Sequence, residues 1–151
     1  MELDVLLTEA EPRLLDEACS SLRRCGVRHY EAAGEAITRQ RLAALFALVV
    51  GAIRSRDLAG LGAACEGIAV ERFNQGFGIC EVQSAFNSLE QVMWRHVVET
   101  APPADVPDAV ALLSTVVGFG KDALARQYVS LASRRHAPAL DVAALAAGLE
   151  W

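Results

Sequence analysis

The stretch that decides the fold is residues 69–82, which read AVERFNQGFGICEV. Its first half continues an apolar pattern of helical period, the two glycines Gly76 and Gly78 interrupt it, and a second helical pattern runs on to Trp94. Glycine ends helices readily because it adopts left-handed backbone conformations without steric cost. The stretch therefore predicts a hairpin of two long helices joined by a short glycine turn.

The helical pattern extends along the chain on both sides of this hairpin. Alanine and leucine dominate, β-branched residues are scattered, and apolar residues recur with a period near 3.6. Asp57 is a residue type that favours the N-cap position. We expect helices over residues 34–54, 57–75, 79–100 and 105–136.

The two ends of the chain carry weaker helical signals. Thr8 and Glu11 have the spacing of a capping box, Pro12 falls in the tolerated first turn, and Gly26 is placed to end a helix. We expect a helix from Thr8 to Gly26, preceded by a short helix or an ordered arm. Residues 138–148 start with a proline suited to the first helical position and predict a further helix.

Short connections between these segments favour antiparallel packing of sequence neighbours. The predicted fold is an all-α domain of five or six helices, and the pattern fits either an antiparallel bundle or a globin-like arrangement. We expect residues 1–136 to form a helical sensor or interaction domain. Residues 137–151 are expected to form a C-terminal helix or the start of a linker.

Composition excludes several classes of function. Hydrophobic residues make up 53% of the 151 residues, which argues against disorder, and the net charge of −5 gives no electrostatic reason to bind nucleic acid or an anionic membrane. No uncharged run is longer than residues 42–53, which is shorter than the roughly 20 residues of a membrane span. The acidic start lacks the basic region of a signal peptide. We expect a cytoplasmic protein without nucleic-acid or membrane partners.

No motif for metal binding or catalysis is visible. The four cysteines show no C-x-x-C spacing, and the three histidines lie apart from them and from each other. The paired Glu-x-x-His motifs of di-iron bundles and the motifs of Ser or Cys nucleophiles are missing as well. We expect four small buried thiols in a reducing compartment, no metal, no cofactor, no catalytic residue and no enzyme activity.

Arg72 does not fit an ordinary apolar core. At about 100° per residue it falls in the middle of the apolar arc of its predicted helix. A guanidinium keeps its charge, so burial requires a partner. The alternatives are that Arg72 reaches solvent at the helix end, that it pairs with a structural carboxylate such as Glu81 or Glu90, or that it anchors an anionic ligand or partner in a central pocket.

Four other residues are candidates for contact with a ligand or partner. Trp94 lies off the apolar stripe of its helix and predicts contact with a second helix or a dimer interface. His96 lies nearer the core, either as a satisfied core residue or as a haem or metal ligand. Gln127 and Tyr128 interrupt an apolar face, either as polar contacts inside a cavity or as groups that satisfy the backbone or reach solvent.

The hairpin also carries a family resemblance. Its pattern resembles the N-terminal domain of RsbRD-type co-antagonists over residues 42–128, on Glu71, Arg72, Gly76, Glu81, Val82, Phe86, Leu89 and Trp94. The resemblance implies a helical signal-input module, usually dimeric, that carries no catalytic residues and precedes STAS or other output domains. The related RsbR sensor domain resembles a globin that has lost its haem. Since no output domain is recognisable after residue 136, we expect a stand-alone relative or a part of a longer regulator.

The leading hypothesis is a non-enzymatic signal-input or protein-interaction domain of a bacterial regulatory system, in the stress response, that acts as a homodimer. Its further partner would be a downstream regulatory protein or an output domain. The alternative is a helical domain that binds a small molecule or a haem-like cofactor, with His29 or His96 as the candidate ligand. Measuring the oligomeric state tests the first hypothesis, and the absorbance of bound haem tests the haem version of the second.

Overall fold

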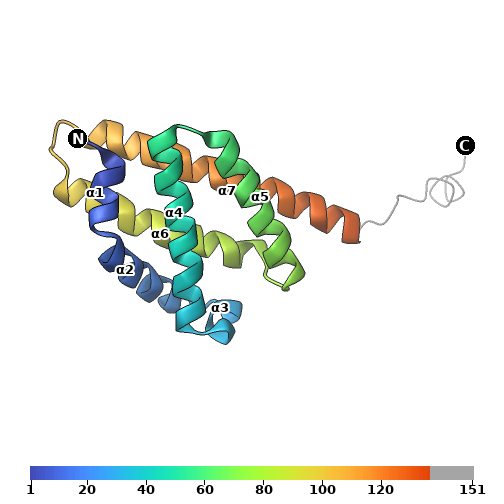
Figure 1. Ribbon diagram of the computed structural model, residues 1–151. Coiled ribbons are helices and arrows are strands. Elements are labelled where there is room, and N and C mark those ends of the chain that lie inside the picture. The colour runs from blue at the N-terminus through green and yellow to red at the C-terminus, as the bar shows by residue number, and fades with distance from the viewer. Residues whose placement is uncertain (137–151) are drawn as a thin grey trace, which may run out of the picture.

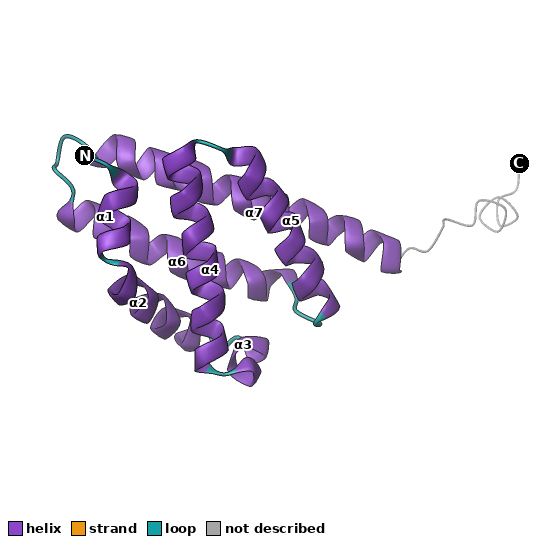
Figure 2. Cartoon of the chain, in the orientation of Figure 1, coloured by secondary structure: helices purple, strands orange, loops and turns teal. Residues whose placement is uncertain are grey.

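The computed structural model describes residues 1–136, and all regular structure in this part is α-helical (Figures 1 and 2). The predicted all-α fold is confirmed. The helix expected over residues 138–148 lies outside the described residues. The helices of the described part are α1 (Leu3–Glu9), α2 (Glu11–Arg24), α3 (Arg28–Ala33), α4 (Glu35–Ser55), α5 (Leu58–Asn74), α6 (Ile79–Thr100) and α7 (Val106–His136).

Helix α4 is the centre of the arrangement, because it contacts each of the other six helices of the described part. Around it, α2 packs on α6, α6 packs on α7, and α7 packs on α5. Figure 1 shows α4 crossing α6 and α7, with α2 and α5 on opposite sides of it. The largest fully buried side chains are Phe46, Leu7, Leu14, Leu22, Leu42, Leu89, Met93, Leu113, Leu124, Val49, Val82 and Val97.

This central place explains the apolar character of α4. By length and composition, α4 is the one helix of residues 1–136 that could cross a membrane. A core helix of a soluble protein passes the same test, and the inward face of α4 is buried against its neighbours. The finding is therefore weak evidence for a membrane span.

The predicted helices from residue 34 onward match the structure closely. The bounds of α6 are those predicted, and the bounds of α4, α5 and α7 agree within one residue. Asp57 is the N-cap of α5, where its carboxylate accepts a hydrogen bond of 3.0 Å from the Gly60 amide. The predicted helical hairpin and its glycine turn are confirmed.

The start predicted at Thr8 is wrong. Thr8 lies inside α1, where its hydroxyl donates a hydrogen bond of 2.7 Å to the Asp4 carbonyl one turn earlier. The break falls at Ala10, and α2 begins at Glu11 with Pro12 in its first turn. A hydroxyl that bonds back to its own helix cannot cap the next one, which is why the capping-box spacing misleads here.

The short helix α3 was not predicted. It lies between Gly26 and Gly34, which both have positive φ (63° and 90°) and so turn the chain at each end of the helix. Six residues are too few to show a helical period in the sequence. Helix α3 nevertheless matters, because it carries Tyr30 into the core.

Candidate functional site

The turn between α5 and α6 is built as a Schellman motif. Gly76 has φ of 86°, the Phe77 amide donates to the Arg72 carbonyl at 3.0 Å, and the Gly76 amide donates to the Phe73 carbonyl at 3.1 Å. The motif folds the chain back so that the Phe77 ring is buried against the end of α5. A buried aromatic ring is thereby fixed beside the Arg72 side chain.

Arg72 is buried, with 8% of its surface exposed. Its guanidinium contacts the Glu71 carboxylate at 2.9 Å and the Gln75 side-chain oxygen at 3.3 Å, and it lies 5.8 Å from the centre of the Phe77 ring. Arg72 thus pairs with a carboxylate, as one of the alternatives predicts, but the carboxylate is that of Glu71 and not that of Glu81 or Glu90. These carboxylates pair instead with His29 and Lys121, at 2.8 and 3.0 Å.

A second arginine, Arg41 of α4, meets Arg72 over the same ring. Its guanidinium lies 5.3 Å from the Phe77 ring centre, and its Nη2 is 3.5 Å from the Gln75 side-chain oxygen. Its Nη1 is buried and has no hydrogen-bond partner among residues 1–136. Burial, followed by the positive charge of Arg72, lowers the pKa of Arg41. Two cations therefore lie beside one ring, with Arg72 buried and Arg41 half-buried.

Two tyrosines complete this end of the molecule. Tyr30 is buried edge-on to Phe77, with ring centres 5.1 Å apart, and burial raises its pKa. The Tyr128 hydroxyl donates a buried hydrogen bond of 3.1 Å to the Phe77 carbonyl. Burial raises the pKa of Tyr128 to about 12. Tyr128 thus supports the turn from α7, while its neighbour Gln127 is only half-buried.

A small cavity of about 30 Å³ lies between the two guanidiniums and the core. Both arginines and Tyr30 line it, and its remaining walls are apolar side chains of α4, α5 and α6. We call it the guanidinium cavity. Its lining residues are Tyr30, Arg41, Leu42, Leu45, Ile68, Arg72, Val82, Ala85 and Phe86.

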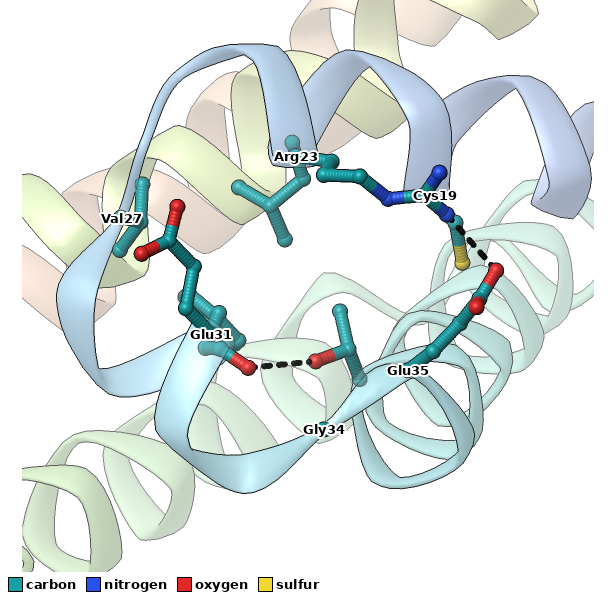
Figure 3. Close-up of a pocket in the computed structure, with 9 residues that line it drawn as sticks. Cys19, Arg23, Val27, Glu31, Gly34 and Glu35 are labelled. Carbon is teal, nitrogen blue, oxygen red and sulfur yellow. Dashed lines mark hydrogen bonds and ion pairs between the residues drawn. The ribbon is translucent and has the colours of Figure 1, made fainter.

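Tyr30 also lines a second cavity, of about 240 Å³, between α2, α3 and the start of α4. We call it the α3 pocket. Figure 3 shows its side chains arranged around a hollow, with the Arg23–Glu35 ion pair of 2.7 Å at the rim. The inner wall is mostly apolar and includes Cys19, Leu22 and Val27. This apolar lining suits a small apolar molecule better than an ion.

His29 and Glu81 form a hydrogen bond of 2.8 Å, between Nδ1 and the carboxylate, that joins α3 to the start of α6. The Glu81 carboxylate also accepts a hydrogen bond of 2.7 Å from the Gly78 amide at the N-terminus of α6. Burial opposes ionisation of Glu81, but the hydrogen bonds from His29 and Gly78 together lower its pKa. The pair fixes α3, and with it Tyr30, against the turn.

The other sequence candidates lie elsewhere. His96 is buried between α1, α2 and α6, where Nδ1 accepts from the Arg13 guanidinium at 2.7 Å and Nε2 is 3.2 Å from the Leu6 carbonyl. This network assigns the neutral tautomer with its proton on Nε2. Both ring nitrogens are engaged, so haem or metal ligation would require these bonds to break.

Trp94 lies on the surface of α6. It is 45% exposed and lines a shallow groove with Ser21 of α2, Cys25 directly after α2, and Lys121 of α7. The structure therefore brings Arg72 and Tyr128 together at the α5–α6 turn, and places His96 and Trp94 in two separate regions.

The cysteines differ in burial. Cys19 and Cys65 are buried, and burial raises the pKa of both thiols, that of Cys65 to about 11. Cys25 and Cys80 are exposed, so the prediction of four buried thiols is wrong. No group of three or more potential metal ligands occurs within residues 1–136.

Sequence reasoning missed Arg41, Tyr30 and Phe77. Arg41 could have been found, because it stands four residues before Leu45 and eight before Val49 on the apolar face of its helix. The count of helical angles that singled out Arg72 applies equally to Arg41. Tyr30 and Phe77 lie in a short helix and a turn, where no period marks a buried side.

These features define a helical domain with two small cavities and no recognisable reaction centre in the part of the chain that is described. The family model for the N-terminal domain of the RsbT co-antagonist protein rsbRD matches residues 12–144. The chain belongs to this family, a family of regulatory domains, as the sequence resemblance predicts. No curated protein and no solved structure matches the chain. The matched range includes the α5–α6 turn and all helices from α3 to α7.

Proposed function

We propose that the chain is a regulatory input domain that acts through protein–protein contact, as a homodimer and without catalysis of its own. The observation that carries the proposal is the family match over residues 12–144. The description of the family names co-antagonism of RsbT, so the proposed downstream partner is an RsbT-like protein or an attached output domain. A signal would act by favouring one packing arrangement of the helices over another.

The surface of α6 supports a dimer interface. Trp94 and Val98 are one helical turn apart and are 45% and 43% exposed. Exposed tryptophan is costly to leave in water and is enriched at the centres of interfaces. Four free cysteines, two of them exposed, support a location in the reducing cytoplasm.

Light scattering coupled to size exclusion tests the dimer. We expect the wild-type chain to have twice the monomer mass at tens of micromolar, and Trp94→Glu to be monomeric because a buried, unpaired carboxylate opposes association. Ile37→Glu is a matched control, since Ile37 is equally exposed, at 45%, on α4. A monomeric wild type would contradict the homodimer. If Ile37→Glu alone were monomeric, the dimer interface would include α4 and not the Trp94 surface of α6.

The α3 pocket supports a second candidate function, the binding of a small apolar molecule. Its volume of about 240 Å³ is below that of most sites for drug-sized ligands, and its lining is mostly apolar. The pocket is bounded by α3, which reaches the α5–α6 turn through the His29–Glu81 pair. A molecule bound in the pocket would therefore affect the position of α3 against the same turn.

Toluene is a suitable probe for this second function. We expect saturable shifts of the Leu22 and Val27 methyl resonances on addition of toluene, and their loss in Val27→Trp, which fills the pocket. Val5→Trp, on the exposed side of α1, should leave the response unchanged. Methyl shifts of equal size all over the protein would count against a defined site.

A further inference from the structure

The guanidinium cavity carries an excess of positive charge. Arg41 and Arg72 both line it, and no carboxylate is among its lining residues. Of the neighbouring carboxylates, Glu71 contacts Arg72 with a side chain that is 61% exposed. Glu81 is held by His29 and by the Gly78 amide. Two guanidiniums therefore face one carboxylate, which leaves one positive charge without a counterpart.

The hydrogen bonding of the site is incomplete as well. Arg72 contacts Glu71, Gln75 and the Tyr30 side chain, while Arg41 makes one long hydrogen bond within residues 1–136, to the same Gln75 oxygen, besides its contact with the Phe77 ring. Nη1 of Arg41 is buried and unpartnered among residues 1–136. A buried guanidinium nitrogen without a partner is unfavourable, and an anion both accepts its hydrogen bond and opposes its charge.

We propose that the guanidinium cavity binds one small monovalent anion, chloride or a carboxylate as small as formate, between Arg41 and Arg72. The inference goes beyond the proposed function and does not depend on it, because it rests on the geometry of this cavity alone. One net positive charge matches one monovalent anion. The cavity volume of about 30 Å³ exceeds the roughly 10–15 Å³ that one water needs, and it favours a small anion over a large one.

The anion would join two helices whose charges otherwise repel. Arg41 comes from α4 and Arg72 from the last turn of α5, and the Phe77 ring lies within 6 Å of both. Binding adds an attractive contact to each guanidinium without moving the ring. The bound anion therefore stabilises the α4–α5 contact directly beside the α5–α6 turn.

The test compares anions at constant pH and ionic strength in the full 151-residue chain. The protein is prepared in sodium gluconate, whose anion is too large for the cavity, and gluconate is then replaced stepwise by chloride or formate. We expect saturable shifts of the Arg41 and Arg72 Nε–H resonances in ¹⁵N NMR spectra, and a rise in Tm of about 3–5 °C at tenfold excess over Kd. Equal shifts of all arginines, or none, would overturn the proposal.

Two variants separate the site from a general effect of salt. Arg41→Met removes one guanidinium but keeps the apolar stem, so the rise in Tm with chloride should disappear, as should the shift of the Arg72 resonance. Arg39→Met is the matched control, because Arg39 lies two residues away on α4 and pairs with Asp16 on the surface. A chloride response that persists in Arg41→Met, or that is lost equally in both variants, contradicts the site. The wild-type NMR titration decides the question even if Arg41→Met folds poorly.

Discussion

The middle of the bundle and its α5–α6 end are buried to a similar degree by different means. In the middle, Leu89, Met93 and Val97 of α6 are no more than 1% exposed and belong to the apolar core. At the α5–α6 end, Arg72 and Tyr128 are 8% and 5% exposed although both carry polar groups. Apolar contacts are non-directional, whereas each buried polar group needs a partner in a defined geometry. Packing in the first region therefore tolerates small shifts, whereas packing in the second depends on the partners of each polar group.

The largest effect is expected in the middle of the bundle. Met93→Ala should lower the free energy of unfolding by about 3 kcal/mol, because Met93 is fully buried and its truncation leaves a cavity. Urea unfolding at constant pH measures the change. The control Gln91→Ala, at an exposed position of the same helix, should stay within about 0.5 kcal/mol of wild type. Equal effects of the two variants would mean that this face of α6 is not core.

At the α5–α6 end the backbone of the turn should matter most. Gly76→Ala should lower the free energy of unfolding by about 1–2 kcal/mol, because Gly76 has φ of 86°, a conformation that a Cβ atom disfavours. Gly67→Ala is the opposite control. Gly67 lies within α5, and a Cβ atom added there would meet open space. Alanine at this position should therefore raise the free energy of unfolding by up to about 1 kcal/mol. The opposite signs are readily resolved by urea unfolding.

The same comparison explains how far the sequence could be interpreted. The long helices were predictable because their apolar residues repeat with helical period, and the α5–α6 turn because Gly76 interrupts that period. The site was only partly predictable. Arg72 stood out against an apolar arc, but its partners Glu71 and Gln75 follow from how the last turn of α5 packs, and helix α3 shows no period at all.

The Tyr128 hydroxyl should contribute less than the turn backbone. Tyr128→Phe leaves the Phe77 carbonyl without its buried hydrogen bond and should cost about 1 kcal/mol at pH 7. Burial raises the pKa of Tyr128 to about 12, above the value of about 10 in an unfolded chain. The stabilisation is therefore complete below about pH 10 and is lost as the pH rises toward 12, so the difference in stability between wild type and variant should narrow between about pH 10 and 12.

The smallest effect, and the one with the clearest pH signature, is expected at Glu81. Glu81→Gln should cost about 0.5–1 kcal/mol at pH 7, because the amide accepts from Gly78 less strongly than the carboxylate and carries no charge toward His29. Urea unfolding at pH 7, 5 and 3 measures how this difference changes in acid.

Folding lowers the pKa of Glu81, and this lowering sets the direction in which the stability changes with pH. The stabilisation is present above the unfolded pKa of about 4.3 and is lost as the pH falls through the lower folded value. The stabilities of wild type and Glu81→Gln should therefore converge near pH 3. Glu66→Gln, at an exposed position of α5, should match wild type at every pH. A gap at Glu81 that does not change with pH would mean that shape, rather than charge, holds α3 against the turn, and the contrast between the two regions would then rest on the arginines alone.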